Sequence, residues 1–296
     1  MIAQIRVQIR PLSTYALFAM LLAAVFFPGC YSATKIPIDT VRYGVGEAKY
    51  PRLLFVFLHG NGDRNSVFDD KGFVEAVRAH GLSVDMISVD AHVGYYMNGT
   101  ILTRLKEDVI VPARAKGYEG IWLIGNSLGG FGSLSYAQKY PNEITGVVLL
   151  GPFLGERPII REIRDAGGLQ RWEPGDVFLK TKEDAEKHIW IWLKENGQQG
   201  PLWSGDKDHP KGQRVVPKIY LGYGTKDRFT YAQDLLASLL PPEQVIAMDG
   251  GHDWPTWKKL WNQFLDRKIF RQCMSRNSIL PWFFILLSLD LHSIFK

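Results

Sequence analysis

The sequence predicts an α/β fold: an open, mostly parallel, twisted sheet flanked by helices, with a lid-like insertion. Two observations lead to this expectation. Short apolar runs alternate with amphipathic stretches through the middle of the chain, as in parallel strands joined by right-handed helical crossovers. Most of these runs are continuously apolar, which indicates strands that are buried on both faces.

The apolar runs and the helical patterns can be placed in order along the chain. The predicted strands are 52–59, 82–90, 120–125, 146–151, 218–224 and 244–250. The predicted helices are 66–80, 100–116, 128–140, 231–240 and 254–267. Gly81 is a plausible C-cap for the first helix, Pro112 should break or bend the second, and Pro141 ends the third.

A long segment, residues 152–217, separates the fourth and fifth predicted strands and exceeds an ordinary crossover. It holds one amphipathic stretch, residues 182–195, and four tryptophans: Trp172, Trp190, Trp192 and Trp203. We expect a lid or cap over the carboxyl ends of the strands. Its tryptophans are possible substrate contacts, but aromatic residues in an insertion more often serve packing. The alternative is a surface excursion whose tryptophans bury a small core of its own.

Residues 1–29 have the pattern of a targeting segment. Arg6 and Arg10 precede an uncharged, mostly apolar run, residues 15–27, which is short for a membrane span. Gly29 followed by Cys30 resembles the lipobox of bacterial lipoproteins, although Phe27 and Pro28 replace its usual leucine and small residue. The alternatives are an ordinary signal peptide, an uncleaved anchor or a buried first helix. We therefore expect a secreted or cell-envelope protein that associates with the membrane through the Cys30 lipid or an anchor.

The catalytic body is expected to span residues 30–268, followed by a basic and apolar tail, residues 269–296. The apolar run 279–289 is too short to cross a bilayer. It is either an extension outside the fold or a segment that lies in a membrane interface.

Charge and cysteine content exclude several kinds of partner. The chain has 35 basic and 30 acidic side chains, a net charge of +5 that is scattered rather than clustered, so no nucleic-acid partner is expected. Its two cysteines, Cys30 and Cys273, show neither metal-ligand spacing nor a disulfide framework, and a bond between them would join two tails. No metal is expected.

The stretch "GNSLG" sets Ser127 between a predicted strand and a predicted helix, with Gly125 and Gly129 on either side. A sharp strand-to-helix turn exposes a nucleophilic serine and requires small neighbours. Ser127 is therefore a candidate nucleophile, and a simple helix N-cap is the alternative.

A serine nucleophile needs a base, and in this topology the acid and the histidine follow it in that order. Asp227 follows the strand 218–224, and His252 follows the strand 244–250, so both should reach the sheet edge where Ser127 lies. Asp249 and Asp253 compete with Asp227 for the role of acid.

The stretch "HGNG" after the first predicted strand supplies an open loop, because Gly60 and Gly62 leave its backbone uncovered. The backbone N–H groups of Asn61 and Leu128 are the expected oxyanion-hole donors. His59 is expected to order this loop, and both His59 and His92 are possible pocket residues. Of the other histidines, His80 is interpreted as a solvated helix end, and His188 and His209 belong to the insertion.

Together these motifs resemble the α/β-hydrolase superfamily, of the serine esterase type. The segments "HG", "GNSLG", "GTKD" and "GGHDW" match in residue type and order, and the resemblance covers residues 52–267 apart from the insertion. It implies hydrolysis of an acyl ester or thioester with no cofactor. Haloalkane dehalogenases share an "HGN" loop but use an aspartate nucleophile, which Ser127 argues against.

The sequence therefore predicts a serine hydrolase that cleaves a small-molecule carboxylic ester, or a thioester, through an acyl-enzyme on Ser127. Asp227 and His252 complete the triad. The alternative is a non-catalytic, envelope-anchored binding protein that uses the same fold as a scaffold.

Overall fold

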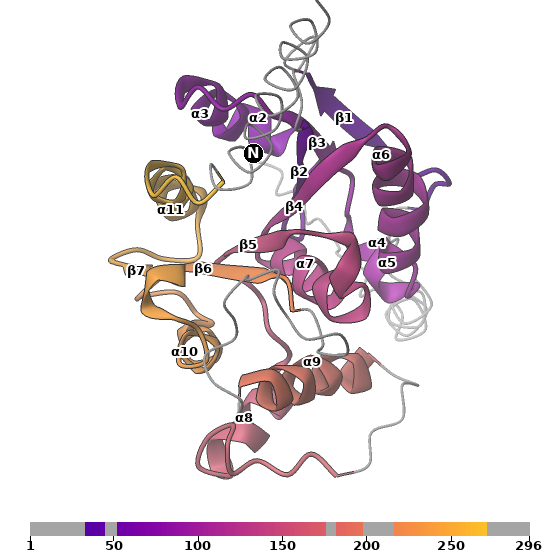
Figure 1. The fold of residues 1–296 in the computed structure, drawn as a ribbon. Coiled ribbons are helices and arrows are strands. Elements are labelled where there is room, and N and C mark those ends of the chain that lie inside the picture. The colour runs from indigo at the N-terminus through magenta and orange to yellow at the C-terminus, as the bar shows by residue number, and fades with distance from the viewer. Residues whose placement is uncertain (1–32, 45–51, 176–181, 198–215, 271–296) are drawn as a thin grey trace, which may run out of the picture. The chain divides into compact units, whose positions relative to one another are not determined.

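The computed structural model describes residues 33–44, 52–175, 182–197 and 216–270 (Figure 1). The predicted targeting segment with Cys30, most of the C-terminal tail with Cys273, and Trp203 and His209 lie outside these residues. Within the described ranges, none of the helices combines the length and the apolar composition that a membrane span requires.

Seven strands form one sheet in the order β1-β3-β2-β4-β5-β6-β7. All neighbours run parallel except β1 and β3, which are antiparallel. The strands are β1 (Thr40–Tyr43), β2 (Arg52–Leu58), β3 (Asp85–Val89), β4 (Tyr118–Asn126), β5 (Gly146–Leu150), β6 (Lys218–Gly224) and β7 (Val245–Met248). The six predicted strands are all present, so the expected open and mostly parallel sheet is confirmed.

Strand β1 was not predicted, because none of its side chains is fully buried and it has no apolar run. It extends the sheet at the edge, with Thr40 opposite Val89 of β3. Just before it, the backbone N–H of Ile38 donates to Asp108 Oδ2 at 2.8 Å. A buried ion pair between Asp108 and Arg104, 3.0 Å apart, holds that carboxylate in place.

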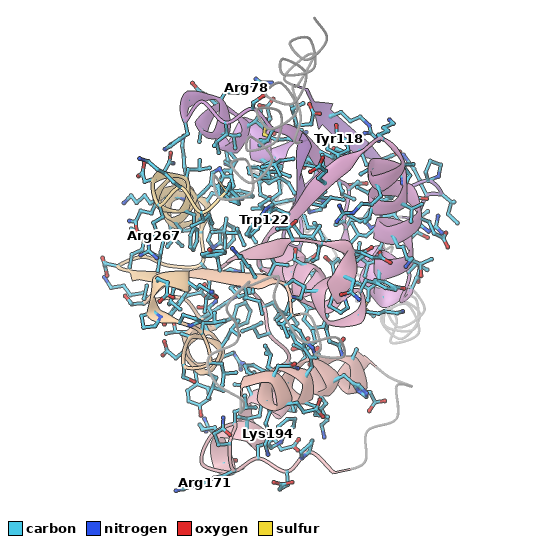
Figure 2. The ribbon with its side chains drawn as sticks, viewed as in Figure 1. Arg78, Tyr118, Trp122, Arg171, Lys194 and Arg267 are labelled. Carbon is cyan, nitrogen blue, oxygen red and sulfur yellow. The ribbon has the colours of Figure 1, made fainter. Side chains whose placement is uncertain are left out.

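Alternate side chains of the central strands pack on opposite faces of the sheet, as a pleated strand requires. In β2, Leu54, Val56 and Leu58 belong to one core, and the residues between them belong to the other. The second core is closed by aromatic side chains, among them Trp122 of β4 (labelled in Figure 2), whose ring lies 5.1 Å from that of Phe270.

Helices cover both faces of the sheet (Figure 1). The second core contains residues of α2 (Val67–Asp70), α3 (Phe73–Ala79) and α11 (Trp254–Asp266). The first core contains residues of α4 (Val93–Met97), α5 (Ile101–Arg104), α6 (Val111–Ala115), α7 (Leu128–Lys139), α8 (Arg157–Asp165), α9 (Lys182–Gly197) and α10 (Thr230–Ala237). Two short 3-10 turns, Pro141–Glu143 and Pro242–Gln244, precede β5 and β7.

The predicted helix 100–116 is interrupted, as Pro112 suggested. The interruption is a wider helical turn rather than a sharp bend. Between α5 and α6, residues Leu105–Ile110 form a π-helix. Pro112 lies at the start of α6, where it has no N–H to give to the preceding turn and its ring crowds that turn's carbonyl. The wider turn accommodates the proline while the helix continues in the same direction.

The insertion contains α8 and α9, which pack against each other near α7 (Figure 1). Its described tryptophans are buried: Trp190 Nε1 donates to the backbone oxygen of Leu154, and Trp172 Nε1 donates to Glu162. The burial of Trp172, Trp190 and Trp192 agrees with the packing role that aromatic residues in an insertion more often have. Trp190 ties α9 to the loop after β5, and the role of the insertion as a lid stays a prediction.

The parallel register brings the carboxyl ends of β2, β4, β5 and β6 to one edge of the sheet. Leu58 is level with Gly125, Asn126 with Leu150, and Leu150 with Gly222. Loops that leave these strands must therefore start close together, although they lie far apart along the chain.

Candidate active site

Ser127 forms the turn between β4 and α7 and has φ 50° and ψ −117°. Apart from Lys268, it is the one non-glycine residue of the described chain with positive φ. Such a backbone costs about 1–3 kcal/mol and persists only where the surroundings impose it. Here the N–H of Ser127 donates to the oxygen of Leu150, and the oxygen of Ser127 accepts from the N–H of Phe153 at 3.0 Å.

The glycines on either side of Ser127 are required by contact between backbones. A Cβ on Gly125 would lie 2.2 Å from the oxygen of Gly129, and a Cβ on Gly129 would lie 1.9 Å from the oxygen of Leu58. No rotamer change can relieve these collisions, because both partners are main chain. The first turn of α7 therefore packs directly on the ends of β4 and β2.

The side chain of Ser127 does not cap α7, although Ser127 occupies the N-cap position. Its Oγ lies 2.9 Å from Nε2 of His252 instead. Nδ1 of His252 lies 2.8 Å from Oδ2 of Asp227. Because the carboxylate can only accept, Nδ1 carries the proton and the neutral ring presents an acceptor at Nε2 to the serine hydroxyl.

Asp227 is fully enclosed by its partners. In addition to the bond between Oδ2 and His252, Oδ1 accepts from the backbone N–H of Phe229 at 2.8 Å. Oδ2 also accepts from Nε2 of Gln233 at 3.2 Å. The other two candidate acids lie elsewhere. Asp249 is 78% exposed and paired with Lys226, whereas Asp253 caps α11 by accepting from the N–H of Thr256. That bond holds the pKa of Asp253 below its ordinary value.

Two aromatic rings hold the imidazole of His252 edge-on. The Phe229 ring centroid lies 5.0 Å from it, and that of Trp257 lies 4.9 Å from it, both nearly perpendicular. These contacts restrict rotation of the ring and keep Nε2 directed at Ser127.

The loop after β2 passes directly beside the nucleophile. A Cβ on Gly60 would lie 3.2 Å from Cβ of Ser127, so a side chain at residue 60 would crowd the serine. Asn61 follows Gly60, and Leu128 follows Ser127, so both predicted oxyanion donors come from segments that meet at Ser127. Gly62 has φ 86° and turns the loop away.

His59 orders this loop, as predicted. It is buried, its Nδ1–H donates to the oxygen of Gly60 at 2.8 Å, and its Nε2 faces Oδ1 of Asp90 at 3.5 Å. The His59 ring holds the pKa of Asp90 below its ordinary value of 3.8. Burial has the opposite effect on Asp63, later in the same loop, and raises its pKa.

His92 is the N-cap of α4: its Nδ1 accepts from the N–H of Gly94, and its ring packs against that of Tyr95 at a tilt of 46°. The sequence suggested a pocket role for it, and the observed bonds are those of a helix cap. His80 bonds Asp266 at the end of α3, and His188 bonds the backbone of α9. Within the described chain, none of these three histidines bonds a member of the Ser127–His252–Asp227 set.

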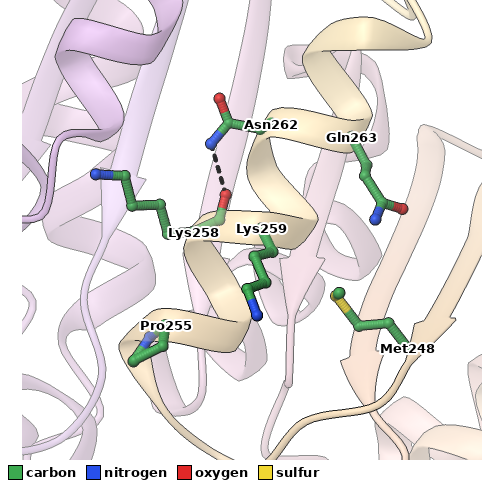
Figure 3. Close-up of a pocket in the computed structure, with 6 residues that line it drawn as sticks. All are labelled: Met248, Pro255, Lys258, Lys259, Asn262 and Gln263. Carbon is green, nitrogen blue, oxygen red and sulfur yellow. Dashed lines mark hydrogen bonds between the residues drawn. The ribbon is translucent and has the colours of Figure 1, made fainter.

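A surface hollow of about 520 Å³ lies along α11 (Figure 3). It is lined by Met248, Pro255, Lys258, Lys259, Asn262 and Gln263. Its two lysines are exposed and point apart in Figure 3, and its lining includes none of Ser127, Asp227 and His252. The hollow is therefore separate from the chemistry at Ser127.

Sequence and structure comparisons agree with this geometry. Residues 55–258 match the model of the alpha/beta hydrolase family. No curated protein matches the sequence. Among solved structures, the fold is similar to that of a ferulic acid esterase, with a TM-score of 0.52 and 16% identity over 78% of this chain and 91% of that one. It is also similar to fluorophosphonate-binding serine hydrolase F of Staphylococcus aureus, with a TM-score of 0.50 and 12% identity over 77% of this chain and 96% of that one.

Replacing Gly129 by alanine should prevent folding, because the new Cβ would collide with the main chain of β2. Gly81→Ala is the matched control: it also adds one methyl group, in open space at φ 66°. It should lower the free energy of unfolding by only about 1 kcal/mol. Urea unfolding and yield of soluble protein test both variants. A folded Gly129→Ala protein with unchanged stability would contradict the backbone contact.

Replacing Asp90 by asparagine should destabilise the protein in a pH-dependent way. The folded pKa of Asp90 is lowered, so its contribution is present above its unfolded pKa and is lost as pH falls through the folded value. We expect a loss of about 1 kcal/mol near neutral pH that shrinks as the pH falls below 3.8, the ordinary value for Asp. Unfolding free energies across this range, with exposed Asp69→Asn as control, test it. A difference that does not change with pH would contradict it.

Proposed function

Because the chain belongs to the α/β-hydrolase family and joins Ser127, His252 and Asp227 in one hydrogen-bonded line, we propose that it is a serine hydrolase of carboxylic esters. The observation that carries the proposal is the pair of short distances on either side of the imidazole. A fold can be shared by proteins with many functions, but this arrangement has a specific chemical use.

The reaction follows from the geometry. Nε2 of His252 accepts the proton of Ser127 Oγ as that oxygen attacks the ester carbonyl. Asp227 stabilises the imidazolium that forms, and the N–H groups of Asn61 and Leu128 hold the negative oxygen of the tetrahedral intermediate. His252 then gives its proton to the departing alcohol, which leaves an acyl group on Ser127. A water molecule, activated by the same imidazole, releases the acid and restores the serine.

Partly exposed apolar side chains beside the triad support an ester with an apolar group. The ring of Phe153 lies 5.6 Å from that of Phe229, which in turn contacts His252. The backbone N–H of Phe153 is bonded to Ser127 itself. We call these two rings, together with the half-buried Leu128, the apolar wall. An acyl or alkyl group that extends from the scissile carbonyl would lie against it. The similarity to a ferulic acid esterase agrees with such a substrate.

A serine-directed fluorophosphonate should label the native protein at Ser127. Ser127→Ala should abolish labelling, and His252→Ala should slow it strongly because the hydroxyl loses its base. Hydrolysis of p-nitrophenyl butyrate should fall by about a thousandfold or more in either variant. Ser238→Ala, which alters an exposed serine at the end of α10, is the control and should react normally.

Labelling that persists in Ser127→Ala would refute the nucleophile. An unlabelled, folded wild-type protein that turns over no ester would favour the non-catalytic binding protein instead.

Phe153→Leu should change the preference for acyl-chain length. Each methylene that packs against the apolar wall contributes about 0.8 kcal/mol at most, so kcat/KM should fall by about tenfold for longer acyl chains and little for acetate. Tyr140→Leu is a matched control, because Tyr140 is half-buried at the opposite end of α7. Kinetics with a series of p-nitrophenyl esters measure the effect. Equal losses for acetate and octanoate would exclude an acyl contact at Phe153.

A further inference from the structure

Gln233 is a buried glutamine on α10, 0% exposed, whose side chain lies against the loop that carries Asp227. Its Nε2 donates to Oδ2 of Asp227 and to the backbone oxygen of Pro152, both at 3.2 Å. No sequence motif includes this residue, and the reaction described above does not use it.

The chemistry of its neighbours fixes the orientation of the Gln233 amide. Both neighbours are acceptors, so the NH2 group must face them, and a flipped amide would set its oxygen against a carboxylate. The amide oxygen, Oε1, is buried without a hydrogen-bond partner in the described protein. An apolar side chain of the same size would avoid this unpaired oxygen. The amide of Gln233 therefore lowers the stability of the fold through its unpaired oxygen. Its contribution is the two hydrogen bonds that its NH2 group donates.

One of these hydrogen bonds goes to Oδ2 of Asp227, the same oxygen that bonds His252. Oδ2 of Asp227 accepts from Nδ1 of His252 at 2.8 Å and from Gln233, while Oδ1 accepts from Phe229. With donors on both oxygens, the carboxylate has one orientation. If the bond from Gln233 were missing, Oδ2 would be held by the imidazole alone.

The second donor links the acid to the nucleophile. Pro152 precedes Phe153, whose N–H holds the oxygen of Ser127. Pro152 also packs against Gly130 of α7. A Cβ on Gly130 would lie 2.9 Å from Cβ of Pro152, so the contact depends on glycine at that position. Gln233 thus bridges the loop of Asp227 and the loop that fixes the strained turn at Ser127.

We propose that Gln233 is a positioning residue, which sets Asp227 Oδ2 for His252 and ties the acid to the nucleophile turn. This inference rests on the proposed function, because positioning matters only if the three residues perform a reaction. Gln233 itself does not contact the reacting atoms.

Gln233→Met tests the inference, because methionine keeps the length and volume of the side chain and removes both donors. Gln244→Met is the matched control: Gln244 is also buried with an unpaired Oε1, but it precedes β7, at the opposite end of that strand from His252. We expect kcat for p-nitrophenyl butyrate to fall about tenfold in Gln233→Met with little change in KM. Gln244→Met should retain wild-type kinetics.

The pH profile separates positioning from a structural role. Without the amide of Gln233, Oδ2 of Asp227 accepts from no side chain other than His252. It is then a stronger acceptor and stabilises the imidazolium more. The acidic limb of kcat/KM should therefore move to higher pH in Gln233→Met and stay in place in Gln244→Met. Asp253, the other carboxylate near His252, is unchanged in both variants.

Gln233→Glu keeps the shape and is the second variant in case methionine prevents folding. A protonated glutamic acid can donate to Asp227, whereas its ionised form repels that carboxylate. This variant should be active at low pH and lose activity at alkaline pH, with a falling limb that wild type lacks. An alkaline profile like that of wild type would overturn the inference.

The outcomes separate this inference from the proposed function. If wild type turns over no ester and does not react with a fluorophosphonate, the proposed function fails. If wild type is active and Gln233→Met is folded with the kcat and pH profile of Gln244→Met, only the role of Gln233 fails.

Discussion

The site depends on one steric constraint, the direct packing of the first turn of α7 on the main chain of two strands. At Gly129 the helix lies so close to Leu58 of β2 that no side chain fits between them. This contact leaves the chain no gentler path from β4 into α7, and Ser127 takes up a positive φ as a result. It also sets the loop after β2 beside the serine. Ser127 and the loop after β2 are therefore placed by a single backbone contact.

Hydrogen bonds between loops fix the remaining residues of the site relative to Ser127. Asp227, Gln233, Pro152 and Phe153 form a continuous path from the acid to the backbone oxygen of Ser127. On the other side of the site, His59 bonds the oxygen of Gly60, and its Nε2 lies 3.5 Å from Oδ1 of Asp90. Both sets of contacts lie at the edge of the sheet where the parallel strands end. Since these loops come from distant parts of the chain, the relative position of the three reactive groups is a property of the whole sheet.

The sequence predicted the strands that are buried on both faces, because a short, continuous apolar run between turn residues is typical of such a strand. It missed β1, whose four residues bury little, and it could not show that the proline at 112 would widen a turn rather than bend the helix. At the site, strand order and motif spacing brought Ser127, Asp227 and His252 to one edge. They could not show that Asp249 is exposed and that Asp253 caps a helix, since both depend on side-chain direction in a turn. Gln233 had no signal at all, because a glutamine within a helix resembles a surface residue until its burial is known.

Several energetically unfavourable features of the molecule lie beside Ser127, His252 and Asp227. Ser127 holds a strained backbone, both amide atoms of Asn126 are buried without a partner in the described protein, and so are Oε1 of Gln233 and Nε1 of Trp257. Each such atom costs about 1–3 kcal/mol, and these residues adjoin the triad in sequence or space. A protein that used this fold only as a binding scaffold could replace each of them by an apolar residue and become more stable. Unpaired buried atoms also occur away from the site, as at Oε1 of Gln244, so it is the strained backbone of Ser127 beside His252 and Asp227 that argues for a reaction here.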